Sequence, residues 1–165
     1  MSQARMMPMS ELSQDLYGLS AATEEAFLNY GKALLVIAGA DGEVGEAEFA
    51  WLVRHQRKMG APEHVIDEYR EFDYRVADLA TLLPAIRTDV DTWQAAPHLV
   101  YHAIQMSGAD GVYTDEERAQ VLRAARMMGV ADDIVLSLHA LVDMEQAVND
   151  LRAALFHVSS LPADV

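Results

Sequence analysis

Two short acidic segments hold the residue types and spacing best suited to chemistry. Positions 41–48 and 110–117 together contain eight carboxylates and no basic residue. The eight are Asp41, Glu43, Glu46, Glu48, Asp110, Asp115, Glu116 and Glu117. Carboxylate oxygens are the ligands that Ca²⁺ and Mg²⁺ prefer, and crowded carboxylates repel one another unless a cation offsets their charge. The two segments therefore predict a divalent-cation site.

The spacing matches the second half of an EF-hand loop, which has Asp at position five, Gly at six and a bidentate Glu at twelve. Each segment supplies these three, as Asp41, Gly42 and Glu48 and as Asp110, Gly111 and Glu117. Positions one and three would be Ile37 and Gly39, then Met106 and Gly108, which carry no side-chain oxygen. We therefore expect no complete cage within one loop, but one weak cation shared by both.

In this hypothesis the first ligands are Asp41, Glu48, Asp110 and Glu117, with outer charge from Glu43, Glu46, Asp115 and Glu116. We expect the cation to be Ca²⁺ or Mg²⁺. Zn²⁺ is less expected, because the chain has no cysteine to bind it. A purely structural explanation stays open beside it. Asp-Gly commonly forms turns, in which Gly42 and Gly111 supply positive φ, and Thr114-x-x-Glu117 is a capping box. Capping explains Glu48 less well, since Gly45 has no side chain.

Other chemical patterns are weaker. His98 and His102 are four residues apart on an expected helix and could share a metal, but H-E-x-x-H is missing. Phosphate-binding loops, dinucleotide fingerprints and nucleophile elbows are absent, so we expect no enzyme and no catalytic residue. An exposed Trp51 would indicate a partner groove, whereas a buried one would be a core anchor.

An internal repeat relates the two acidic segments to each other. Residues 39–60 and 108–129 share ten identities in 22 positions at an offset of 69. Further on, 76–86 resembles 148–158 at an offset of 72. The chain therefore contains two related halves, about 21–86 and 92–158.

Each half has the pattern helix, acidic turn, helix, glycine stop, helix, helix. We expect a helix capped by Ser20 and ending near Gly39, another from about Gly45 to Gly60, and a long one over 131–158. The sequence predicts an all-α chain, a single helical bundle of about seven to eight helices over 20–160. A polar lead-in at 1–19 with a short helix from Glu11 precedes it, and a tail at 161–165 follows.

Composition limits the partners. A formal charge of −14 over 165 residues repels nucleic acids and anionic membranes, so neither is expected as a partner. No apolar leader or stretch of about 20 apolar residues is visible, which argues against membrane insertion. With no cysteine, these features predict a cytoplasmic protein.

At the two A-D-G-x-x-x-x-x-E segments, each followed by a helix ending in M-G, the chain resembles the TerB-like tellurite-resistance family. The resemblance implies an all-helical fold of two related halves. It also implies that the acidic motifs lie near each other and bind metal through Asp41, Glu48, Asp110 and Glu117. We therefore expect a non-enzymatic, cation-dependent interaction module of a stress or metal-resistance pathway, with a protein partner and a homodimer among the candidates. The alternative is a metal-free helical scaffold, like a co-chaperone adaptor.

Overall fold

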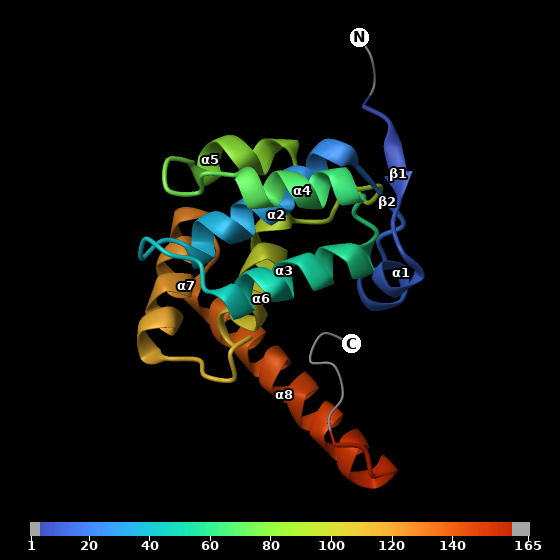
Figure 1. Ribbon diagram of the computed structural model, residues 1–165, viewed down its shortest axis with the longest axis vertical. Coiled ribbons are helices and arrows are strands. Elements are labelled where there is room, and N and C mark those ends of the chain that lie inside the picture. The colour runs from blue at the N-terminus through green and yellow to red at the C-terminus, as the bar shows by residue number, and fades with distance from the viewer. Residues whose placement is uncertain (1–3, 160–165) are drawn as a thin grey trace.

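The computed structural model describes residues 4–159, and the tail predicted at 161–165 lies outside them. The described part of the chain holds eight α-helices, one 3₁₀ turn and one two-stranded sheet (Figure 1). In chain order these are β1 Met6–Pro8, α1 Glu11–Tyr17, β2 Ala21–Thr23, α2 Glu24–Ala38, α3 Glu46–Met59, α4 Glu63–Glu71, α5 Leu79–Leu82, the 3₁₀ turn Leu83–Ala85, α6 Ala95–Ser107, α7 Asp115–Met127 and α8 Asp132–Phe156. The predicted all-α class is confirmed.

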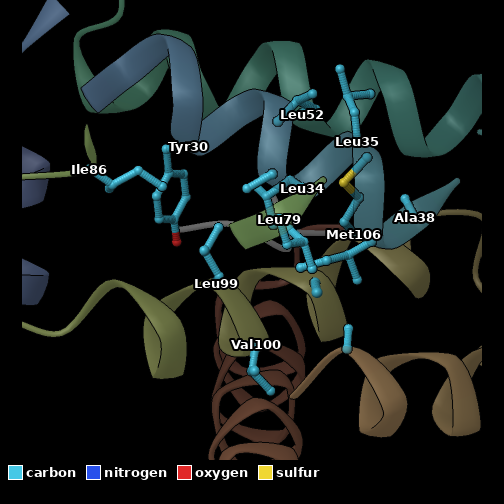
Figure 2. Packing of buried hydrophobic residues seen from close by; sticks show 14 of the residues in the cluster. Tyr30, Leu34, Leu35, Ala38, Leu52, Leu79, Ile86, Leu99, Val100 and Met106 are labelled. Atoms are coloured by element: carbon cyan, nitrogen blue, oxygen red, sulfur yellow. The ribbon is translucent and has the colours of Figure 1, made fainter. Parts of the chain in front are cut away.

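The core forms where α2 and α6, the first helices of the two halves, pack together. Leu34 and Leu35 of α2 lie among side chains from α3, α5 and α6 (Figure 2). Both leucines and Leu99 of α6 are fully buried, which removes a large apolar area from water. Met106 of α6 is buried as well.

The repeat is visible as duplicated local structure. Arg57 makes a bidentate ion pair with Glu63, and Arg126, 69 residues later, makes the same pair with Asp132. Both pairs join the helix that follows an acidic turn to the helix after it. The glycines that end the first of those helices, Gly60 and Gly129, both have positive φ. These features connect corresponding elements in the two halves.

The halves differ after these ion pairs. In the first half the helix breaks at 72–78, and α5 turns back to pack on α2. In the second half the chain continues as the single helix α8, which extends away from the body (Figure 1). Leu79 of α5 is buried, whereas its counterpart Leu151 in α8 is 59% exposed.

The lead-in packs onto the domain. β1 pairs antiparallel with β2, and Ser13 and Leu19 are buried. The short helix expected from Glu11 is present as α1. The expected cap at Ser20 is wrong, because 21–23 form β2 and Thr23 caps α2 by accepting from the Ala26 amide.

None of the helices in the described range 4–159 is long and apolar enough to cross a membrane.

Candidate functional site

Each acidic segment folds into the same compact turn. The Oδ1 atom of Asp41 accepts the amide of Glu43 at 3.2 Å, and that of Asp110 accepts the amide of Val112 at 2.9 Å. Gly42 and Gly111 follow with φ of 108° and 89°, a region that disfavours other residues. Both glycines therefore occupy turn positions with positive φ.

The two glutamates cap the helices that follow. Glu48 Oε1 accepts the amide of Gly45 and Glu117 Oε2 accepts the amide of Thr114, each at 2.9 Å. Thr114 also accepts the amide of Glu117 at 3.1 Å, which completes the predicted capping box. At the start of α3 only one of the two capping-box hydrogen bonds forms, the one from the Gly45 amide to Glu48. The other cannot form, because Gly45 has no side chain to accept the Glu48 amide.

A buried glutamine joins the halves beside this region. Gln120 of α7 donates its side-chain amide to the carbonyls of Ile37, at 2.5 Å, and Ala38, at 3.0 Å. These carbonyls are at the C-terminal end of α2, directly before the first acidic turn. Gln120 therefore holds α7, which follows the second acidic turn, against α2, which precedes the first.

The electrostatics of Glu48 show that the acidic turns share one environment. Burial, the largest cause, raises the pKa of Glu48, and the hydrogen bond from the Gly45 amide opposes this. Repulsion from the carboxylates of Glu117, Asp41 and Asp110 raises the pKa further. Glu48 of the first half therefore lies within electrostatic reach of Glu117 and Asp110 of the second half.

The arrangement is not a closed metal cage. No group of three or more histidines, cysteines or carboxylates among residues 4–159 is placed to hold a metal ion. Glu48 and Glu117 are half-buried, whereas Asp41 and Asp110 are exposed. Exposure is also high for the four acids expected to supply outer charge, Glu43, Glu46, Asp115 and Glu116. Carboxylate oxygens suit Ca²⁺ or Mg²⁺, but side-chain rotation would have to gather them.

An arginine and a tyrosine beside the first turn were missed by sequence reasoning. Arg75 donates to the carbonyl of Gly42 at 3.0 Å and lies over the ring of Tyr74. The Tyr74 hydroxyl accepts the amide of Val44 at 3.1 Å. Both residues come from the break at 72–78, more than 25 positions along the chain, so no local pattern could reveal them.

The two histidines that the sequence singled out, His98 and His102, lie in a separate aromatic cluster within the core. His102 contacts the hydroxyls of Tyr30 and Tyr17 through its two ring nitrogens, at 2.5 and 3.2 Å. His98 stacks on His102 and accepts a hydrogen bond from Trp93 at 2.7 Å. Burial lowers the pKa of His98 to about 4 and that of His102 well below its usual range. These neutral rings line a cavity of about 50 Å³ and act as polar members of the core.

Trp51 belongs to the same aromatic cluster. It is buried and stacks on His55 with ring centroids 4.7 Å apart. Of the two alternatives weighed for this tryptophan, the core anchor is therefore the one observed. Trp51 is therefore not part of an exposed partner groove.

Comparison with protein-family models finds no match, and none is found among curated proteins. Among solved structures the chain is similar to a tellurite resistance protein from Nostoc punctiforme PCC 73102, determined by crystallography at 1.85 Å resolution. The TM-score is 0.79 and the sequences are 24% identical, over 93% of this chain and 94% of the other. The chain thus has the fold of that tellurite resistance protein.

Proposed function

We propose that this chain is a non-enzymatic, cytoplasmic interaction module of a tellurite- or metal-resistance pathway, and that a divalent cation binds between its two acidic turns. The observation that carries the proposal is the position of the half-buried Glu48 near the second acidic turn. Burial is the largest cause that raises the pKa of Glu48, and the carboxylates of Glu117, Asp41 and Asp110 raise it further. Such repulsion destabilises the fold, and a bound cation would relieve it. The fold shared with a tellurite resistance protein supports the pathway.

The expected ligands fit a weak site for Ca²⁺ or Mg²⁺. Each of the four carboxylates already has one oxygen bonded to a backbone amide. The second oxygen of each carboxylate would meet the cation once side-chain rotation brings the four groups together. With so few protein ligands we expect a dissociation constant of roughly 10⁻⁴–10⁻³ M.

Thermal unfolding with added cations tests this proposal. At a concentration about ten times the dissociation constant, a cation that binds only the folded state adds about 1.4 kcal/mol. For a chain of this size that raises Tm by roughly 3–6 °C. The wild type should show this rise with Ca²⁺ or Mg²⁺ and lose it in chelator. The double variant Asp41→Asn/Asp110→Asn should show none.

A matched control separates site binding from general charge. Glu68 and Glu71 of α4 are exposed, and Glu68→Gln/Glu71→Gln removes the same two charges away from the turns. This variant should respond to cation as the wild type does. Equal responses in both double variants, or no rise with any cation up to about ten millimolar, a concentration above the expected dissociation constant, would refute the cation site.

The metal-free scaffold is the second candidate, and one observation favours it. The outer half of α8 exposes large apolar side chains, as an interaction surface would. If no cation stabilises the protein, this surface becomes the leading basis for its function.

A further inference from the structure

The exposed apolar side chains of α8 follow the spacing of a coiled-coil seam. Leu141, Met144, Val148, Leu151 and Leu155 recur at intervals of three and four residues, which is the a/d pattern of the heptad repeat. All five are exposed, with Met144 at 66% and Leu155 at 63%. In a folded chain this dense, regular stripe is costly to leave in water.

The neighbouring positions suit close helix packing. Three exposed alanines, Ala140, Ala147 and Ala154, flank the seam at heptad spacing and occupy its g positions. Small side chains there let a second helix approach closely. The e positions on the other flank carry Glu145 and Arg152, which have opposite charges. Glu145 is half-buried and also accepts a hydrogen bond from the Tyr101 hydroxyl of α6 at 2.7 Å.

The first half of the chain shows what such a segment does when it has a partner surface. There the break at 72–78 lets Leu79 and Leu83 of the corresponding segment fold back onto α2. Their counterparts at an offset of 72 are Leu151 and Leu155. Because α8 runs straight, these two cannot reach their own body (Figure 1).

We propose that the outer half of α8 pairs antiparallel with α8 of a second copy of this chain, through the seam from Leu141 to Leu155. With Val148 opposite Leu151 of the partner subunit, Glu145 faces Arg152 of the partner subunit, and the reverse pair forms by symmetry. A parallel pair would instead place each of these charges beside an alanine. The antiparallel arrangement also places the two helical bodies at opposite ends of the paired helices.

Two further features support a second copy as the occupant. The helix is already formed and anchored on the body by its first half, so pairing carries no cost of helix nucleation. A surface groove of about 550 Å³ begins beside Leu141 and is lined by Tyr101 and Leu138. The antiparallel register brings the end of the partner's helix to this groove. The contact is short, so the dimer should dissociate on dilution. This dimer proposal is independent of the proposed cation site.

Sedimentation equilibrium of the full chain tests the association. The wild type should approach twice the monomer mass of 18.2 kDa as concentration rises. Leu151→Glu places a charge in the seam and should hold the chain at the monomer mass. Leu136→Glu is the matched control, because Leu136 is 75% exposed on the same helix but precedes the seam. That variant should still dimerise. A monomeric wild type, or equal effects of the two substitutions, would overturn the proposal.

Disulfide crosslinking tests the orientation, and the absence of cysteine gives a clean background. An antiparallel pair predicts that chains with Val148→Cys crosslink faster to chains with Leu151→Cys than to themselves. Faster self-crosslinking of Val148→Cys would overturn the antiparallel arrangement. Arg152→Glu should weaken the dimer by placing like charges together, and adding Glu145→Arg should restore it. Failure of the second change to restore association would contradict the predicted charge pairing.

Discussion

Removing the two hydrogen bonds made by Gln120 should measure how strongly the halves are joined. Gln120→Met keeps the length and apolar stem of the side chain but cannot donate to the carbonyls of Ile37 and Ala38. A typical buried hydrogen bond contributes about 0.5–1.5 kcal/mol net, so losing two costs about 2 kcal/mol. This corresponds to a fall in Tm of roughly 4–8 °C for a chain of this size.

Urea denaturation of Gln120→Met, followed by far-UV circular dichroism, is the assay. Gln146→Met is the matched control, because Gln146 is exposed and its side chain donates to Asp150 one turn away on α8. Its free energy of unfolding should stay within about 0.5 kcal/mol of the wild type, as expected at a surface position. If Gln120→Met costs no more than this control, the argument that the glutamine joins the two halves fails.

Three other perturbations have definite expected outcomes. Gly42→Ala should cost about 1–2 kcal/mol in urea denaturation, because φ is 108° there, whereas Gly108→Ala, at a φ of −85°, should cost little. Leu34→Ala should cost about 2–5 kcal/mol by the same measurement, since Leu34 is fully buried. The pKa of His98 is lowered to about 4 in the folded chain, so between pH 6.5 and 4 the unfolded chain binds more protons than the folded chain does. The free energy of unfolding should therefore fall as the pH drops through this range. In urea denaturation at a series of pH values, His98→Gln should reduce that fall in the free energy of unfolding by roughly 3 kcal/mol. An unchanged dependence of the free energy of unfolding on pH would contradict this prediction.

The turns and helix ends could be predicted because their causes are local. The side chains of Thr114 and Glu117 each accept the other residue's backbone amide within one helical turn. Position 42 has a positive φ, which glycine adopts without strain. The strands β1 and β2 could not be predicted, because each has three residues and forms only by pairing with the other. Asp89 accepts the amides of Ser20 and Ala21 in that region, a contact that no local pattern shows.

The candidate site was predicted only in part, for the same reason. The sequence identified the acidic residues, and the repeat indicated that they occur as a pair of equivalent turns. It could not show that Arg75 reaches the first turn or that Gln120 ties α7 to α2. Nor could it show His55 beside His102, because the three-dimensional packing of α3 against α6 brings these rings together.

The break at 72–78 has a consequence for how the two halves could diverge after a duplication. A copy with the break covers its own apolar segment and is self-sufficient. A copy without it becomes a rigid arm whose apolar side chains depend on another molecule. A break of this kind, introduced near the middle of α8, would convert the proposed dimer into a monomer and would leave the acidic turns unchanged. Self-association could therefore be gained or lost by changes in a few residues of one linker.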